Sequence, residues 1–238
     1  PPRSTLFPYT TLFRSLDARG AQPKAYDLSQ LVYIAPHADL YIYSLVDDAL
    51  PQVAARVESM KINHDSIHVH TSGSVGIDVL AQYFTNAAVL YPFQTFSKQQ
   101  RVSMTNVPLF IEATNDKTYA VVRQLADSLS TQVFEADGQQ REQLHIAGVF
   151  ANNFVNAMYD IACEQMQKAD LPFSILLPLI DLTAQKIHTL QPGEAQTGPA
   201  VRNDQKVINK HIAQLQGLQK DVYELTTRYI MQTHNERR

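Results

Sequence analysis

The chain has 238 residues, of which 45% are apolar and 18% are charged, and its formal net charge is -3. This composition excludes a disordered chain and predicts one or two domains with a sizeable core, at about 150 residues per domain. No cluster of Lys and Arg is longer than the terminal pair Arg237 and Arg238, so we expect no nucleic-acid partner. The only cysteine, Cys163, excludes an internal disulfide and favours a reducing, cytoplasmic compartment, with the thiol buried in a helix.

Two observations argue against a membrane protein. The most apolar stretch, 171–182, contains two prolines and Asp181 and is too short to cross a bilayer. The beginning of the chain has no continuous apolar segment before a small-residue cleavage site, as a signal peptide would have. We therefore expect no membrane partner.

The first fifteen residues, PPRSTLFPYTTLFRS, look foreign to the rest of the chain. The near-duplicated TLFP and TLFR follow no helical or strand period, and the segment resembles a translated sequencing adaptor. A natural disordered leader is the alternative. We expect residues 1–15 to be a non-native leader, the native N-terminus to be missing, and the domain that starts at residue 16 to be truncated.

From Asp27 to about Ala136, short apolar runs alternate with amphipathic ones. The apolar runs predict strands, and the helical periods between them predict helices. The expected strands cover 38–46, 66–70, 87–90, 109–113 and 132–136, and the expected helices cover 50–60, 75–84 and 117–129. Strands that alternate with helices predict a mostly parallel sheet with helices on its faces.

From Gln139 onward the pattern is helical, and we place the domain boundary near residue 137. One long helix is expected over 141–168, with an apolar side made of Leu144, Ala147, Ala151, Phe154, Met158 and Ile161. Further helices are expected over 173–190, with a kink at Pro178, and over 204–215 and 219–233, with a loop over 191–203.

A glycine-rich phosphate loop is missing. A dinucleotide-binding α/β domain holds the pyrophosphate in a first βα turn of the form G-x-G-x-x-G. The chain has only eight glycines, no two of which are separated by a single residue. Either this fold never bound a dinucleotide or the loop was lost by truncation, and the foreign-looking leader favours truncation.

Three polar clusters follow predicted strands, where open α/β sheets bind their ligands. They are Asp47-Asp48, His70-Thr71-Ser72-Gly73 and Gln94-Thr95-Phe96-Ser97. The alternative is that such residues simply cap the helices that follow. The second cluster is the most specific, because its glycine permits a close approach of the backbone to a ligand.

The helical region offers two more candidates. At 100° per residue, His145, Asn152 and Asn156 form one narrow stripe opposite the apolar side, which suggests the lining of a cleft. Ordinary exposed polar residues are the alternative.

The second candidate is the segment Thr197–Asp204, which leads into a helix with His211. The seven-residue spacing puts Asp204 and His211 on one side, and Arg202 is suited to bind a carboxylate or phosphate. The alternative makes Asp204 an N-cap and His211 a packing residue beside Val207, Ile208 and Ile212. No group of residues has metal-ligand spacing, so we expect no metal.

Several motifs in one order resemble a known family, the Rossmann-like proteins with the C-terminal domain of unknown function 2520. The matching stretches cover nearly everything from about Asp27 to Tyr229. They are SLVDDALPQVA, VHTSGSVGIDVL, LYPFQTFS, FIEATN, LHIAGVFANNFVNAMY, LLPLIDLT and AQTGPAVRNDQKVINKH. Many members have His before the proline of P-x-Q-T-F-S, whereas this chain has Tyr91.

The family is similar to 6-phosphogluconate dehydrogenase-like and pyrroline-carboxylate-reductase-like oxidoreductases. The resemblance implies a fold of class α/β, with a truncated Rossmann-like NAD(P)-binding domain over 16–137 and an all-α domain for substrate binding and homodimerisation over 138–238. NAD or NADP is the implied cofactor. Related dehydrogenases often use a catalytic Lys on the central helix, where this chain offers His145.

The resemblance also implies site residues, and each keeps its number in this chain. Next to the cofactor we expect Asp47, Asp48, Thr71, Ser72 and Gly73. For catalysis on the central helix we expect His145, Asn152 and Asn153, with the histidine as acid/base because histidine titrates near neutral pH. On the side of a small-molecule substrate we expect Gln94, Thr197, Gly198, Arg202, Asp204 and His211.

Three functional hypotheses stay open, because fold-level analogy does not establish a reaction. The first is an NAD(P)-dependent oxidoreductase acting on a small polar substrate between the two domains, inactive in a truncated chain. The second is a non-catalytic ligand sensor on the same scaffold. The third is a structural dimer whose polar stripe is merely hydrated.

Overall fold

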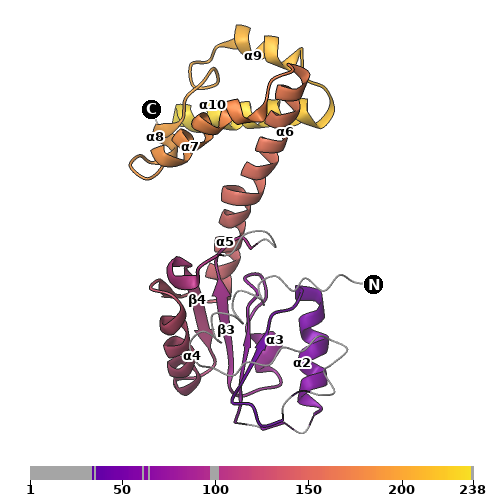
Figure 1. Ribbon diagram of the computed structural model, residues 1–238, viewed down its shortest axis with the longest axis vertical. Coiled ribbons are helices and arrows are strands. Elements are labelled where there is room, and N and C mark those ends of the chain that lie inside the picture. The colour runs from indigo at the N-terminus through magenta and orange to yellow at the C-terminus, as the bar shows by residue number, and fades with distance from the viewer. Residues whose placement is uncertain (1–33, 35, 61, 64, 97–101, 237–238) are drawn as a thin grey trace. The chain divides into compact units, whose positions relative to one another are not determined.

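The computed structural model describes residues 34, 36–60, 62–63, 65–96 and 102–236 (Figure 1). The expected leader and the expected truncation lie outside these residues. The chain divides into two compact units, residues 1–154 and 155–238, and each is described by itself below.

The first unit contains a five-stranded sheet with strand order β1-β2-β3-β4-β5. Its strands are β1 (Leu40–Tyr43), β2 (Ile67–His70), β3 (Ala87–Pro92), β4 (Leu109–Ala113) and β5 (Val133–Glu135). All neighbouring strands are parallel except β3 and β4, which are antiparallel. The five predicted strands and the mostly parallel sheet are confirmed. The carboxyl ends of β1, β2 and β3 therefore lie at the same edge.

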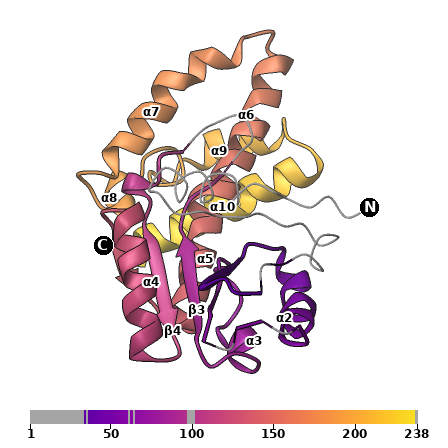
Figure 2. The ribbon, with the colours of Figure 1, turned by 60° about the horizontal axis from the view of Figure 1, so that its bottom comes forward.

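Helices cover both faces of this sheet (Figure 2). The described helices of this unit are η2 (Asp47–Ala49), α2 (Leu50–Glu58), α3 (Asp78–Ala81), η3 (Met104–Asn106), α4 (Asp116–Leu129), α5 (Gly138–Gly148) and the π-helical η4 (Val149–Phe154). On one face, α4 packs Val122, Ala126 and Leu129 against apolar side chains of β2, β3 and β4. On the other face, α2 and α3 pack with Tyr41 and Tyr43 of β1. The alternation of strand side chains between the two faces produces these two cores.

The helix expected over 75–84 is much shorter, because only Asp78–Ala81 is helical. The carbonyl oxygen of Val75 accepts a hydrogen bond from the Arg141 guanidinium, and Gly76 follows, a poor helix former. The Val75 carbonyl oxygen is therefore not used in a helix, and the residues before Asp78 form a loop.

The second unit is helical. Its elements are α6 (Val155–Lys168), η5 (Phe173–Leu176), α7 (Leu177–Lys186), α8 (Pro192–Ala195), α9 (Gln205–Ile212) and α10 (Gly217–Glu236). Pro178 stands at the start of α7 instead of kinking a longer helix, since proline fits the first turn, where its missing N–H costs nothing. No described helix is long and apolar enough to span a membrane.

The helical region begins at a well-defined cap. The Asp137 carboxylate accepts a hydrogen bond from the Gln140 N–H at 2.8 Å, and the Gln140 side chain accepts one from the Asp137 N–H at 2.9 Å. This capping box starts α5 one residue after the boundary expected from sequence. The two compact units nevertheless divide between Phe154 and Val155, so α5 belongs to the unit that holds the sheet.

Candidate functional site

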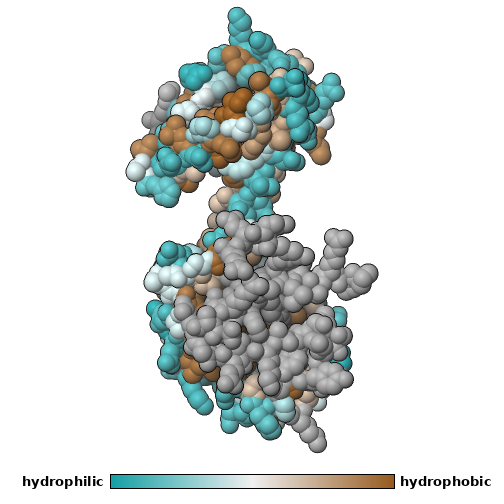
Figure 3. All heavy atoms as spheres, in the orientation of Figure 1, coloured by the Kyte–Doolittle hydropathy of each residue, from teal (hydrophilic) through white to brown (hydrophobic). Residues whose placement is uncertain are grey.

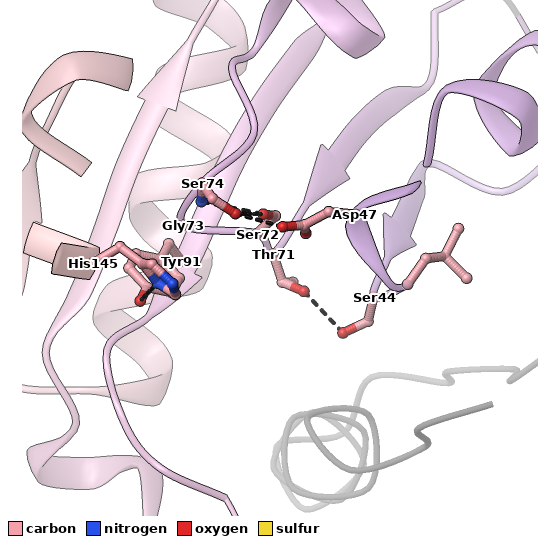
Figure 4. A pocket seen from close by; sticks show the side chains of 9 residues that line it. Ser44, Asp47, Thr71, Ser72, Gly73, Ser74, Tyr91 and His145 are labelled. Carbon is pink, nitrogen blue, oxygen red and sulfur yellow. Dashed lines mark hydrogen bonds between the residues drawn. The ribbon is translucent and has the colours of Figure 1, made fainter. Parts of the chain in front are cut away.

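A pocket of about 200 Å³ lies at the carboxyl-terminal edge of the sheet in the first unit (Figure 4). Residues after β1, residues after β2, the end of β3 and α5 all contribute to it. The described lining consists of Ser44, Leu45, Asp47, Thr71, Ser72, Gly73, Ser74, Tyr91 and His145. This is the place where open α/β sheets bind ligands.

The loop after β2 is held in shape by its own side chains. The Ser72 hydroxyl accepts hydrogen bonds from the N–H groups of Ser74 and Val75, both at 3.2 Å. The Ser72 N–H in turn donates to Nδ1 of the buried His70 at 3.3 Å. Short polar side chains that bond to nearby backbone stabilise such turns, so this corner is fixed before any ligand arrives.

Two hydrogen bonds join the loop after β1 to the loop after β2 across the pocket. Ser44 and Thr71 share one between their hydroxyls at 2.9 Å, and the Ser74 hydroxyl donates to the Asp47 carboxylate. Figure 4 shows these pairs between the two loops. The pocket therefore presents several hydroxyl groups and one carboxylate.

The ring of Tyr91 packs directly on Gly73. A Cβ atom at Gly73 would fall 2.4–2.8 Å from three atoms of that ring, including Cζ, which carries the hydroxyl. Only glycine allows this approach, so the sequence requirement at position 73 comes from the neighbouring tyrosine. Phe93 adds an edge-on ring contact at 6.1 Å between centroids.

Helix α5 docks on the sheet through residues at positions i, i+4 and i+7. Arg141 is fully buried, pairs with Glu112 of β4, and donates to the carbonyl oxygens of Ala136 at 2.9 Å and Val75 at 3.2 Å. Gly148 lies so close to Phe93 that a Cβ would fall 2.8 Å from its ring. Between them, His145 enters the pocket, where Nδ1 is 3.5 Å from the Tyr91 hydroxyl.

Burial and neighbouring charges shift the pKa values of two groups at and beside the pocket. Burial, reinforced by the negative charge of Asp47, raises the pKa of Tyr91, so its phenol stays protonated at neutral pH. Burial, with a smaller effect of the Arg141 charge, lowers the pKa of His70 to about 4, so that imidazole is neutral. Among the described residues, no group of three or more His, Cys, Asp or Glu is placed to hold a metal ion.

The structure brings together five of the residues expected from sequence, namely Asp47, Thr71, Ser72, Gly73 and His145. Four others lie outside the described lining of the pocket: Asp48, Gln94, Asn152 and Asn153. All four are exposed, and the Gln94 side chain accepts a hydrogen bond from the N–H of Thr95. Asn152 and Asn153 lie in the π-helical segment η4, whose wider turns break the 100° spacing that the predicted stripe assumes.

The remaining predicted residues, Thr197, Gly198, Arg202, Asp204 and His211, lie in the second unit. The Asp204 carboxylate caps α9 by accepting from the Val207 N–H at 3.2 Å, and His211 Nδ1 lies 2.9 Å from the Tyr223 hydroxyl. Arg202 is exposed. A site shared between these residues and the pocket of the first unit stays a prediction.

Sequence reasoning missed four lining residues, Ser44, Leu45, Ser74 and Tyr91. Ser44 directly follows β1, and Tyr91 is the residue before the last of β3. Their position at carboxyl ends of parallel strands is the same signal that selected Asp47 and Thr71. Applied to every strand end, that signal would have found them.

A mostly parallel sheet with a polar pocket at its carboxyl-terminal edge, followed by a helical region, defines a Rossmann-like protein. Residues 107–230 match the family described as "Domain of unknown function (DUF2520)", and the chain belongs to this family. The resemblance stated from the motifs is therefore confirmed. Comparison with the curated proteins found no match.

Several solved structures share this fold. The putative NADP oxidoreductase BF3122 from Bacteroides fragilis is 36% identical over 95% of each chain, with a TM-score of 0.88. Protein TM1727 from Thermotoga maritima is 19% identical, covering 86% of this chain and 82% of that one, with a TM-score of 0.68. An imine reductase from Myxococcus stipitatus, solved with NADP+, is 10% identical over 95% of this chain and 89% of its own, with a TM-score of 0.61. The last two show the fold alone.

Proposed function

We propose that the chain is an NAD(P)-dependent oxidoreductase that acts on a small polar carbonyl or imine compound. The observation that carries the proposal is the pocket in which the loop 71–74, Tyr91 and His145 meet at the carboxyl ends of parallel strands. Further support comes from the 36% identical relative described as a putative NADP oxidoreductase.

The residues of the pocket fit one part of the cofactor better than the other. The described lining offers hydroxyl groups and the Asp47 carboxylate but no Lys or Arg, which suits the nicotinamide and its ribose, neither of which is anionic, and disfavours phosphates. A volume of about 200 Å³ is also below the range of whole-ligand pockets, roughly 300–1,000 Å³. No G-x-G-x-x-G occurs in the chain, so no residue is assigned to the pyrophosphate.

Several pocket residues then have a defined task. Thr71, Ser72 and Gly73 hold the nicotinamide end through hydroxyl and backbone groups, and Asp47 fixes the loop through Ser74. A bound nicotinamide supplies or accepts the hydride. His145 takes part in proton transfer at the pocket mouth, where its exposure gives it access to water.

On the substrate side we propose Arg202 as the anchor for an anionic group, and Thr197, Gly198, Asp204 and His211 as further substrate-binding residues. Gly198 has φ 112° and Asn203 φ 52°, so this loop keeps backbone conformations that most residues avoid. Asn152 and Asn153 orient the substrate from η4, a π-helical segment of the kind often found at functional sites.

Binding and turnover test the proposal separately. The protein expressed from its complete gene is melted with NADPH, NADH or neither, and NADPH oxidation is followed with a panel of small keto acids and cyclic imines. A rise in melting temperature with a nicotinamide cofactor and oxidation with one panel member are expected, because a ligand that binds only the folded state stabilises it. Stabilisation without any turnover would favour the ligand-sensor hypothesis, and no stabilisation by either cofactor would overturn the proposal.

We further propose that the helical unit pairs with a second copy of the chain. Among its described residues only Ala200 and Ile208 are buried. Figure 3 shows hydrophobic residues gathered on the helical unit. Nine large apolar side chains of this unit are each between 47% and 80% exposed, namely Leu171, Ile175, Leu177, Leu179, Leu182, Ile187, Leu218, Leu225 and Tyr229. Large exposed apolar patches mark interaction sites, which supports a partner for this unit, and a homodimer is the simplest one.

A further inference from the structure

The strongest unexplained feature of the pocket is the contact between Tyr91 and His145. Tyr91 is half-buried at the end of β3, while His145 is exposed on α5, 54 residues later in the chain. The phenol oxygen and Nδ1 are 3.5 Å apart, a long hydrogen bond of the kind that often tightens when a ligand binds. Figure 4 shows the two side chains next to each other at one side of the pocket.

Few lining groups are able to deliver a proton at neutral pH. Serine and threonine hydroxyls are too weakly acidic, and Asp47 carries a negative charge and accepts a hydrogen bond from Ser74. Among the described lining residues, Tyr91 and His145 remain. Of these, the phenol is the more sheltered from water and the more rigidly held, because its ring is pressed on Gly73 and flanked by Phe93.

We propose that Tyr91 is a catalytic residue that donates the proton to the substrate, and that His145 replaces this proton from solvent. The assignment rests on the proposed oxidoreductase function. It gives the two residues different tasks: the sheltered phenol contacts the substrate, and the exposed imidazole connects the phenol to water.

The step balances without a free phenolate. As the substrate carbon receives a hydride from the reduced nicotinamide, the C=O or C=N π electrons move to the oxygen or nitrogen. That atom takes the proton of the Tyr91 hydroxyl, and the phenol oxygen takes the Nδ1 proton of the His145 imidazolium. The imidazole is left neutral and regains a proton from water. Burial and the charge of Asp47 both raise the pKa of Tyr91 and so disfavour a phenolate, which is consistent with two concerted proton transfers.

The first test needs neither cofactor nor substrate. Nitrogen NMR of the histidine side chains is recorded for the full-length wild-type chain and for Tyr91→Phe, Tyr83→Phe and His145→Gln, the last of which identifies the His145 signal by its loss. Tyr91→Phe keeps the ring on Gly73 but removes the hydroxyl, so the His145 signal and its titration should shift. The matched control Tyr83→Phe lies outside the described lining and should leave both unchanged. An unchanged His145 signal in Tyr91→Phe would overturn the pairing.

The second test measures turnover of the same variants with NADPH and the carbonyl and imine panel. General acid catalysis contributes about 10²–10⁴-fold, so Tyr91→Phe should lower kcat by roughly 100-fold or more with little change in KM. His145→Gln should lower kcat less and reduce its dependence on pH. Full kcat in Tyr91→Phe, with NADPH oxidation by the wild type intact, refutes this assignment alone. Failure of the wild type to bind NADPH or to oxidise it with any compound refutes the oxidoreductase function together with it.

Discussion

The ring of Tyr91 lies directly against the backbone of Gly73, and no side chain fits between them. A Cβ at Gly73 would fall 2.4 Å from the ring carbon Cζ. Gly73→Ala should therefore push the ring away and move the phenol from His145. Because Tyr91 belongs to strand β3, its ring can shift only a little to make room for a methyl group. We therefore expect a loss of about 1–3 kcal/mol in the free energy of unfolding. Urea unfolding measures this loss.

Gly76→Ala is the matched control for Gly73→Ala. The nearest atom to a Cβ at Gly76 is an Asp78 carboxylate oxygen at 3.9 Å, an ordinary contact. This variant should retain wild-type stability within about 0.5 kcal/mol, as surface substitutions usually do. Equal stability of the two alanine variants would show that the Tyr91 ring is not held against Gly73.

The second prediction concerns the buried guanidinium of Arg141. Its hydrogen bonds connect α5 to Glu112 of β4, to Ala136 just before the cap of α5, and to Val75 in the loop after β2. Arg141→Met should lower the free energy of unfolding by about 2–3 kcal/mol, because it leaves the Glu112 carboxylate and two carbonyl oxygens without their donor.

A double-substitution cycle separates the ion pair from the other contacts of Arg141. Glu112 is 24% exposed, so an unpaired carboxylate there is partly hydrated. Adding Glu112→Leu to Arg141→Met should recover part of the loss, since the unpaired charge is removed. If the two substitutions instead add without any coupling, the ion pair does not stabilise the docking of α5.

The sheet was predictable from sequence because its strands differ in pattern from everything around them. Runs such as Leu109–Ala113 are apolar except for Glu112 and are flanked by turn residues, and the observed strand has those same bounds. Helix lengths were less predictable where tertiary contacts intervene. The short α3 illustrates this, since a hydrogen bond from Arg141, 66 residues away, diverts the Val75 carbonyl from a helix.

The site was predictable only in part, for a related reason. The strand-end rule selected Asp47 and Thr71 because their neighbours in sequence reveal the strand ends. The role of Tyr91 depends on a space over Gly73 and on a helix more than fifty residues later, and neither is visible in local sequence. The π-helical turn in η4 likewise has no local signature, so the stripe through Asn152 was computed on a helix of uniform pitch.

The third prediction is a pH dependence of stability. Burial lowers the pKa of His68 and of His70 from 6.5 to about 4. Between these values the unfolded chain binds more protons than the folded one, so the free energy of unfolding should be highest above about pH 6.5 and should fall as the pH drops towards 4. Each histidine contributes a slope of up to about 1.4 kcal/mol per pH unit.

His68→Gln tests whether a buried histidine causes this fall. His68 stacks on Phe84 at 3.5 Å between centroids and pairs with the Tyr43 hydroxyl at 2.8 Å, so the variant is less stable at every pH. Its slope between pH 6.5 and 4.5 should nevertheless be smaller than that of the wild type, because one proton-binding group is gone. Urea unfolding at several pH values gives both quantities, and an unchanged slope would assign the pH dependence to other groups.

The fourth prediction concerns the apolar surface of α7, where Leu179 is 62% exposed in the single chain. If a second copy covers this surface, Leu179→Glu places a charge in an interface, so the chain should dissociate and melt at a lower temperature. If no copy covers it, the substitution is a surface change worth within about 0.5 kcal/mol. Gln185→Glu adds the same charge to the same helix about 120° away, on the side of Asp181, and should leave the dimer intact. Sedimentation across a range of concentrations separates the cases. A wild type that stays monomeric throughout, or a Leu179→Glu variant that associates as tightly as Gln185→Glu, would exclude pairing through α7.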